Sequence, residues 1–224
     1  MCGRFALSAK TRDIENLVPG IKIKRDLTPR YNIAPSQKIA ALLNDNSREL
    51  IYPRWGLVPF WAKDTAIGFS LINARAESLV EKPAFKNAFK KQRCLIFSDG
   101  FFEWKKIDGK TKKIPMFIRL KSGKPFAFAG LWDTWKNPDD NSLILSATIV
   151  TTTPNRLMEQ IHNRMPVILD NSDYDKWLNP GFACEHDLLG CLKQYPESEM
   201  DAYEISDRVN NVRFDDELCI QPIN

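Results

Sequence analysis

The sequence predicts an α+β protein with a mainly antiparallel β-sheet, curled into an irregular barrel-like core, and peripheral helices. Two observations predict this class. The middle of the chain consists of apolar and β-branched runs separated by turn residues, and short amphipathic stretches lie on either side of it. The 224 residues are 43% hydrophobic and 27% charged, as in ordinary globular proteins, and no repeat or low-complexity linker divides them. We therefore expect residues 1–224 to form a single domain.

Apolar periodicity and helix-breaking residues predict the elements of the first 92 residues. They are, in order, a helix that Ser8 caps and Pro19-Gly20 ends, strands over 39–43 and 49–55, and a helix over 75–91 that Pro83 interrupts.

Turn signals divide the middle of the chain into strands, and the strongest is Asp108-Gly109, which is typical of a hairpin. The expected strands cover 94–97, 101–107, 114–120, 125–132 and 143–151, and short helices follow at 155–161, 172–178 and 185–192.

Composition restricts the class of protein. The net charge of +4 is compatible with a nucleic-acid partner without requiring one. No apolar run reaches the ~20 residues of a membrane helix, and the N-terminus has no secretory signal, so we expect a cytoplasmic protein without a membrane partner. Five cysteines without C-x-x-C spacing, and only two histidines, predict unpaired thiols, no metal site and no cofactor.

Cys2 is the residue with the most specific chemistry. Removal of Met1 would leave its α-amine, with a reference pKa of ~7.7–8.0, beside a thiol of ~8.5. Such an aminothiol reacts with an aldehyde: the amine forms an imine, and the thiol then closes a thiazolidine ring. An N-terminal nucleophile can also attack an amide, with its own amine as the base. The position of Cys2 in the sequence is equally compatible with a cysteine that has no catalytic function.

Four other segments contain candidate residues. Asn73 and Arg75 end an apolar stretch, and Glu103 lies among three aromatic residues. This carboxylate is either a paired structural acid or a general acid–base whose pKa is raised by burial. His162 is either a core residue or a catalytic one, and Trp61 is either a core residue or a platform on which bases stack.

Taken together, these segments are similar to the SRAP (SOS response-associated peptidase) family, whose members crosslink to abasic sites in single-stranded DNA. The resemblance spans essentially the whole chain. The matching segments are Met1-Cys2-Gly3-Arg4-Phe5, Arg30-Tyr31-Asn32-Ile33-Ala34-Pro35, Trp55-Gly56-Leu57, Ile72-Asn73-Ala74-Arg75-Ala76-Glu77, Lys82-Pro83-Ala84-Phe85, Arg93-Cys94-Leu95-Ile96, Asp99-Gly100-Phe101-Phe102-Glu103-Trp104 and Ile161-His162-Asn163-Arg164-Met165-Pro166.

The resemblance implies an abasic-site sensor in the DNA damage response, which forms a thiazolidine between its processed N-terminal cysteine and the aldehyde of a ring-opened abasic sugar. The partner would be single-stranded DNA, and the protein a cytoplasmic monomer that associates with the nucleoid when bound to DNA. The implied catalytic residues are Cys2, Asn73, Glu103 and His162. The implied DNA-binding residues are Arg4, Asn32, Pro35, Trp61, Arg75, Lys82 and Arg164.

Two other functions stay open at this point. One is an N-terminal-nucleophile cysteine peptidase, whose activity can be limited to its own Met1–Cys2 bond; the other is a noncovalent binder of single strands. A further basic cluster, at Lys105, Lys106, Lys110, Lys112 and Lys113, is interpreted as a solvated hairpin tip rather than a DNA site.

Overall fold

The computed structural model describes residues 2–107, 109, 111–181 and 184–223. The strands are β1 (Arg4–Leu7), β2 (Arg30–Ile33), β3 (Ala41–Leu43), β4 (Leu50–Ile51), β5 (Arg54–Trp55), β6 (Asn73–Arg75), β7 (Arg93–Ser98), β8 (Gly100–Lys105), β9 (Ile114–Leu120), β10 (Phe126–Lys136), β11 (Leu143–Thr152), β12 (Met165–Pro166) and β13 (Met200–Glu204). The α-helices are α1 (Thr11–Leu17), α2 (Lys86–Lys91), α3 (Arg156–Glu159), α4 (Tyr174–Leu178) and α5 (Glu185–Gly190). Short 3-10 helices are η1 (Thr65–Phe69), η2 (Ala76–Ser78), η3 (Asn171–Asp173), η4 (Glu197–Glu199), η5 (Asp207–Asn210) and η6 (Glu217–Cys219).

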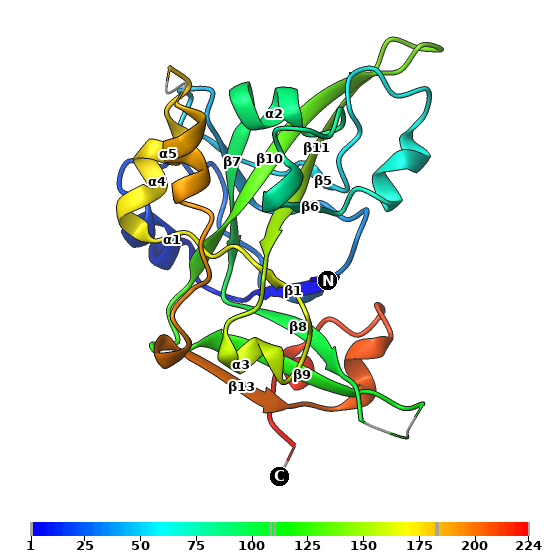
Figure 1. The fold of residues 1–224 in the computed structure, drawn as a ribbon, viewed down its shortest axis with the longest axis vertical. Coiled ribbons are helices and arrows are strands. Elements are labelled where there is room, and N and C mark those ends of the chain that lie inside the picture. The colour runs from blue at the N-terminus through cyan, green and yellow to red at the C-terminus, as the bar shows by residue number, and fades with distance from the viewer. Residues whose placement is uncertain (1, 108, 110, 182–183, 224) are drawn as a thin grey trace.

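The strands form two sheets, one above the other in Figure 1. The lower sheet is antiparallel, in the order β13-β9-β8-β1-β2. The upper sheet runs β12-β11-β10-β7-β3-β4, and β5 and β6 pair with β11. Over the described residues no pairing closes a barrel, so the class is α+β with two sheets and the expected barrel is only a loose description.

The change of sheet occurs between β7 and β8, which are consecutive in the chain. Asp99 separates them, and its carboxylate accepts hydrogen bonds from Ser8 Oγ at 2.8 Å and from Ala9 N at 2.9 Å. These hydrogen bonds hold the chain where it passes from β7 of the upper sheet to β8 of the lower sheet. They also show that the expected cap at Ser8 is wrong, because Asp99 occupies this side chain and the residue that precedes α1 is Lys10.

β11 organises the upper sheet because both of its edges are paired. Ile149 pairs with Gly130 of β10 on one side and with Asn73 of β6 on the other. β5 and β6 run parallel to β11, and Arg54 lies opposite Ser146 on the same edge as Asn73. The partners of Asn73 and Arg54 are three residues apart on β11, which is about 10 Å.

The main core lies between the two sheets. Phe5 of β1 packs edge-on against Trp55, with ring centroids 5.1 Å apart, and against Phe128, at 5.8 Å. All three side chains are at most 1% exposed. This apolar packing holds β1, and with it Cys2, against the upper sheet.

The helix expected over 75–91 is mostly not helical. Arg75 is extended in β6 because its backbone pairs with Thr151, and α2 begins only at Lys86, after Pro83. The strand expected over 49–55 is two short strands, because β4 pairs with β3 whereas β5 pairs with β11. The remaining strands and helices occur within a few residues of their expected ranges, and the 101–107 and 114–120 strands pair as the hairpin β8–β9. Asp108 of its expected turn lies outside the described residues.

None of the helices in the described ranges combines the length and the apolar character that crossing a membrane requires.

Candidate functional site around Cys2

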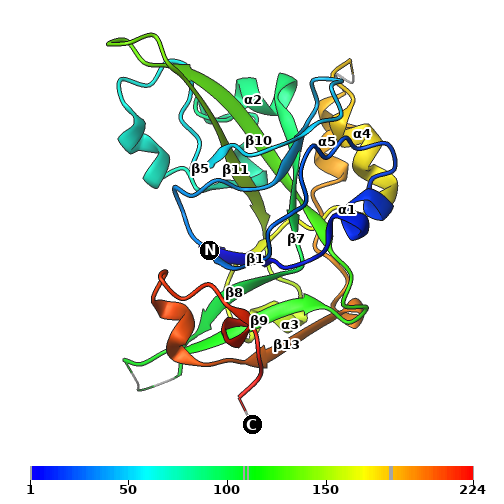
Figure 2. The same cartoon turned by 180° about the vertical axis from the view of Figure 1, so that it is seen from behind.

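Cys2 lies two residues before β1, a strand of the lower sheet that lies on the side of the upper sheet in both views (Figures 1 and 2). Its side chain is fully buried, and Sγ lies 3.7 Å from the carbonyl oxygen of Arg4. Burial raises the pKa of the Cys2 thiol, and the negative charge of Glu103 raises it further. The sulfur is therefore a protonated thiol at neutral pH and not a ready thiolate nucleophile.

Asn73 contacts Cys2 from the upper sheet. Its Nδ2 donates a hydrogen bond of 2.8 Å to the carbonyl oxygen of Cys2. The position of Asn73 is fixed because β6 pairs with β11 at this residue. The second amide atom, Oδ1, is buried and accepts no hydrogen bond from any described residue. Buried polar atoms are nearly always bonded, so this oxygen is suited to a donor from a bound molecule.

Glu103 approaches Cys2 from the lower sheet. It lies on β8, and the pairing of Arg4 with Phe102 places it beside the start of β1. Its side chain is only 3% exposed. Burial raises the pKa of the Glu103 carboxyl, although a hydrogen bond from the backbone of Trp104 opposes the rise. A carboxyl with a raised pKa exchanges protons closer to neutral pH, as general acid–base work requires.

His162 lies between α3 and β12 and is half-buried. Its Nδ1 lies 3.1 Å from the backbone nitrogen and 3.3 Å from the carbonyl oxygen of Arg164, so the tautomer sets whether it accepts or donates a hydrogen bond. Burial lowers the pKa of His162, and the positive charges of Lys106 and Lys113 lower it further. The ring is therefore neutral at pH 7.

His162 also lines a cavity of about 350 Å³. Trp104, the neighbour of Glu103, forms part of the same wall, and the side chains of Lys106 and Lys113 give it a basic rim. The hairpin that the sequence indicated to be a solvated tip thus lies next to a candidate catalytic residue. The remaining lining residues are Glu159, Gln160, Ile161 and Asn163.

Three of the expected catalytic residues therefore meet at one place, with Asn73 from the upper sheet and Glu103 from the lower sheet beside Cys2. Asn73 is hydrogen-bonded to Cys2, Glu103 interacts electrostatically with Cys2, and His162 shares a cavity with the residue after Glu103. This arrangement provides a buried thiol, a carboxyl group that exchanges protons and a neutral imidazole. In the described part of the chain, no three His, Cys, Asp or Glu side chains gather to hold a metal ion.

Arg4 and Asn32, two of the expected DNA-binding residues, bond to each other and to the C-terminal segment. Arg4 donates to Asn32 Oδ1 at 2.7 Å and to the carbonyl oxygen of Val209 at 2.8 Å. Asn32 is fully buried and donates to the carbonyl oxygens of Val209, Asn211 and Phe214. Both side chains connect β1 and β2 to the end of the chain.

Arg164 forms a bidentate ion pair with Glu77, with N–O distances of 2.6 and 2.9 Å. It also donates to the carbonyl oxygen of Thr151 at 2.7 Å, and only 12% of its side chain is exposed. The pair lowers the pKa of Glu77, chiefly through the hydrogen bond from Arg164. Arg164 therefore joins the β12 segment to the residues after β6.

The other expected DNA contacts are accessible. Arg75 and Lys82 are exposed, Trp61 is 47% exposed and Pro35 is half-exposed. Trp61 follows Phe60, which is 57% exposed, so two adjacent rings face solvent.

The loop that carries these two rings is held by three side-chain hydrogen bonds. Ser146 Oγ accepts from Val58 N at 2.8 Å, and Asp133 Oδ2 accepts from Phe60 N at 2.9 Å. The indole of Trp135 donates to the carbonyl oxygen of Ala62 at 2.7 Å. Sequence reasoning missed these supporting residues; the signal that could have indicated them is the polar pair Asp133 and Ser146 within largely apolar strands.

A comparison with protein families decides the family. The model described as "SOS response associated peptidase (SRAP)" matches residues 1–212. The chain belongs to the SRAP family.

Relatives and solved structures agree with this assignment. The SRAP chain is 46% identical over 218 residues to the abasic site processing protein YoqW of Bacillus subtilis, covering 94% of this chain and 95% of that one. It is 30% identical to the abasic site processing protein HMCES of Pongo abelii, covering 88% and 66% of the two chains. A crystal structure of a Bacteroides thetaiotaomicron protein matches all of both chains with a TM-score of 0.89 at 29% identity.

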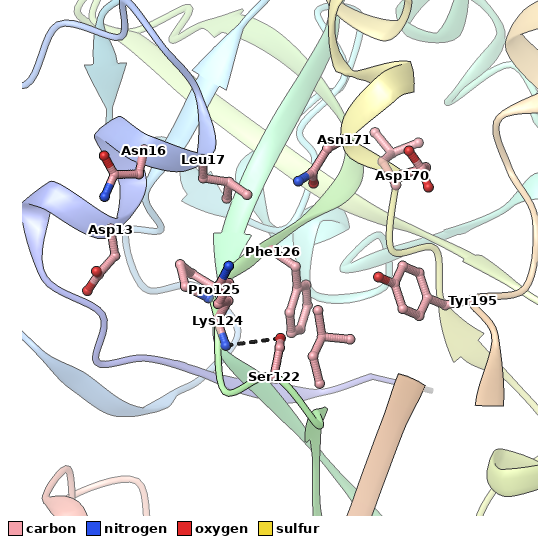
Figure 3. Close-up of a pocket in the computed structure, with 12 residues that line it drawn as sticks. Asp13, Asn16, Leu17, Ser122, Lys124, Pro125, Phe126, Asp170, Asn171 and Tyr195 are labelled. Carbon is pink, nitrogen blue, oxygen red and sulfur yellow. Dashed lines mark hydrogen bonds between the residues drawn. The ribbon is translucent and has the colours of Figure 1, made fainter. Parts of the chain in front are cut away.

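A second pocket, of about 410 Å³, is lined by none of the expected catalytic or DNA-binding residues (Figure 3). The rings of Phe126 and Tyr195 and the side chain of Asn171 border it. Lys124 contributes to it through a turn in which its backbone N–H donates to Ser122 Oγ at 3.3 Å.

Proposed function

We propose that this protein processes abasic sites in single-stranded DNA by forming a covalent link through Cys2. The names of its relatives, abasic site processing proteins, support the substrate. One observation carries the mechanism: Cys2 is buried, hydrogen-bonded through its carbonyl to Asn73, and within electrostatic reach of Glu103. In this proposal, residues 1–224 form one domain that works as a monomer in the cytoplasm during the DNA damage response and associates with the nucleoid when bound to DNA.

The proposed reaction begins after hydrolysis of the Met1–Cys2 bond. The α-amine of Cys2 attacks the C1′ aldehyde of the ring-opened sugar, and the resulting carbinolamine loses water to give an imine. The thiol sulfur then adds to the imine carbon, and its proton goes to the nitrogen. The product is a five-membered thiazolidine, and the whole step releases one water molecule.

The surrounding residues supply proton transfer and position. Glu103, whose pKa burial raises, donates a proton to the leaving hydroxyl and receives one from the thiol. This matters because the raised thiol pKa requires deprotonation at the moment of attack. His162, as a neutral imidazole, assists ring opening of the sugar. Asn73 orients Cys2, and its buried Oδ1 accepts a hydrogen bond from the amine or the sugar.

DNA affinity in this proposal comes from exposed groups that neutralise phosphates or stack on bases. Arg75 and Lys82 are suited to phosphates, and Trp61 is suited to a base next to the lesion. Pro35 lies on the path of the strand. We assign Arg4, Asn32 and Arg164 to the DNA path as well, with the internal hydrogen bonds of their side chains fixing the shape of that surface.

The family description favours a second role, peptide-bond hydrolysis. We restrict this role to release of Met1, because the buried thiol with its raised pKa is poorly suited to attack unrelated peptides.

An N-terminal block tests the proposal. A residue placed ahead of Cys2 that cannot be removed turns the amine into an amide and leaves the thiol intact. Blocked protein should bind abasic single-stranded DNA but give no adduct that survives denaturation, and cleavage of the block should restore crosslinking. A blocked protein that crosslinks normally would refute the thiazolidine mechanism. Turnover of unrelated peptides would instead support the peptidase function. DNA binding without any adduct, by the protein with a free Cys2 amine, would support a noncovalent binder.

A further inference from the structure

We propose that Glu77 is a positioning residue for His162, on which it acts through the side chain of Arg164. This inference rests on the proposed function, since it gives Glu77 a part in the reaction that His162 assists. Glu77 is not among the expected catalytic or DNA-binding residues.

The side chain of Arg164 is held in one orientation. Its two terminal nitrogens donate to the two carboxylate oxygens of Glu77, at 2.6 and 2.9 Å, and Nη2 also donates to the carbonyl oxygen of Thr151 at 2.7 Å. Only 12% of the Arg164 side chain is exposed, against 49% of Glu77. Because a guanidinium is a rigid planar fork, a bidentate pair of this kind fixes its direction as well as its position.

The ion pair spans β11, because its two residues come from segments on opposite edges of that strand. Thr151 of β11 pairs with Arg75 of β6 on one edge and with Pro166 of β12 on the other. Glu77 lies two residues after Arg75, and Arg164 lies two residues before Pro166. The pair therefore joins the chain before β12 to the chain after β6.

The ring of His162 is placed by the backbone of Arg164. Its Nδ1 lies 3.1 Å from the backbone nitrogen of Arg164 and 3.3 Å from its carbonyl oxygen. The backbone N–H of His162 donates to the carbonyl oxygen of Met158 in α3 at 2.7 Å. One side of the His162 loop is thus held by α3 and the other by Arg164, so a displacement of Arg164 displaces the ring.

The same pair relates His162 to the residues beside Cys2. Asn73 of β6 pairs with Ile149, which is two residues before Thr151 and thus about 7 Å away along β11. Asn73 in turn donates to the carbonyl oxygen of Cys2. Glu77 therefore ties the loop of the imidazole to the segment that holds the nucleophile.

The protonation state of Glu77 suits this role. The hydrogen bonds from Arg164 lower the pKa of the Glu77 carboxyl, so the carboxylate is charged at neutral pH. Glutamine in its place keeps the shape and one acceptor oxygen, but it removes the charge and the second acceptor. Glu77→Gln is therefore the smallest change that breaks the bidentate pair.

Single-turnover crosslinking with saturating abasic single-stranded DNA tests the role. Glu77→Gln should slow the reaction by about tenfold, a part of the 10²–10⁴-fold that general acid–base catalysis typically contributes, without weakening DNA binding. Glu77→Asp keeps the charge with a shorter side chain and should give an intermediate rate. The matched control is Glu49→Gln, which loses the same charge from a pair with Lys24 at 2.8 Å and should keep the wild-type rate.

A double-mutant cycle separates positioning from general stability. In a His162→Ala protein, Glu77→Gln should change the rate by less than about twofold, because the ring that the pair positions is absent. Tenfold losses in both backgrounds would overturn the inference, as would a wild-type rate in Glu77→Gln. Thermal unfolding checks that each variant is folded, and Glu77→Asp takes the place of Glu77→Gln in the cycle if the latter is not.

NMR titration of the imidazole gives a readout that does not depend on crosslinking. The chain has two histidines, so His186→Gln identifies the signals of His162. Burial lowers the pKa of His162 in the wild type. Glu77→Gln should move this pKa toward the ordinary ~6.5 as the ring becomes more exposed, and an unchanged titration would overturn the inference. A wild-type protein that forms no adduct would refute only the proposed function, because the titration needs no DNA.

Discussion

The variant Asn73→Ala distinguishes a role of Asn73 in positioning Cys2 from a role in the stability of the fold. The variant removes the 2.8 Å hydrogen bond to the Cys2 carbonyl. Leaving that acceptor without a donor costs about 1–2 kcal/mol. In a chain of 224 residues this lowers the melting midpoint by about 2–8 °C. If Asn73 orients the nucleophile, a shift of about 1 Å slows crosslinking by about 100-fold, far more than the stability loss explains.

Asn44→Ala is the control for this prediction. Asn44 is also buried, donates to the carbonyl oxygen of Lys91 and accepts from Arg93 N and the indole of Trp132, each at 3.0 Å. It should lose at least as much stability without slowing the reaction. The assay is single-turnover crosslinking of an abasic oligonucleotide, quenched in denaturant, beside thermal unfolding. Equal rate changes in the two variants would show that Asn73 is only structural.

Four further predictions concern charge, protonation and burial. Glu103→Gln should slow crosslinking by about 10²–10⁴-fold in single-turnover rates with little change in DNA affinity; a change within twofold would make Glu103 structural. Burial raises the pKa of Glu103, so the free energy of unfolding of the wild type falls as pH rises from the ordinary pKa of ~4.3 through the raised one. Urea unfolding should therefore show the Gln variant gaining stability relative to the wild type toward high pH. Arg75→Ala should reduce the slope of log affinity against log salt by about one for any DNA sequence, whereas an unchanged slope would exclude a phosphate contact. Iodoacetamide at pH 7 should label exposed Cys184 before Cys2, as peptide mapping would show, and early labelling of Cys2 would contradict its burial and raised thiol pKa.

Local patterns predicted most of the fold. The β8–β9 hairpin and the long strands β10 and β11 follow from alternation and turn residues close to their ends. β6 did not, because three residues have no measurable period and Asn73 becomes extended only by pairing with the distant β11. The expected cap at Ser8 failed for a similar reason, because the partner of the Ser8 side chain is Asp99, which is 91 residues away in the sequence.

The candidate site, like the fold, could be predicted only in part from local sequence. Motifs indicated Cys2, Glu103 and His162, whose chemistry is specific to their residue types. They did not indicate that Arg4 bonds to Asn32 and to the carbonyl oxygen of Val209, or that the β8–β9 hairpin adds cations beside His162. Such contacts depend on tertiary packing between segments far apart in the sequence, which periodicity and spacing do not report.

The identity of the residue that is linked to the DNA decides whether Cys2 is the nucleophile. Wild-type protein and an abasic single strand are incubated with and without borohydride, denatured, and analysed by intact mass and peptide mapping. We expect an adduct without borohydride, located at Cys2, with the mass of the protein lacking Met1 plus that of the DNA less one water. An adduct that requires borohydride and maps to a lysine would contradict it, as would a stable adduct formed by Cys2→Ala.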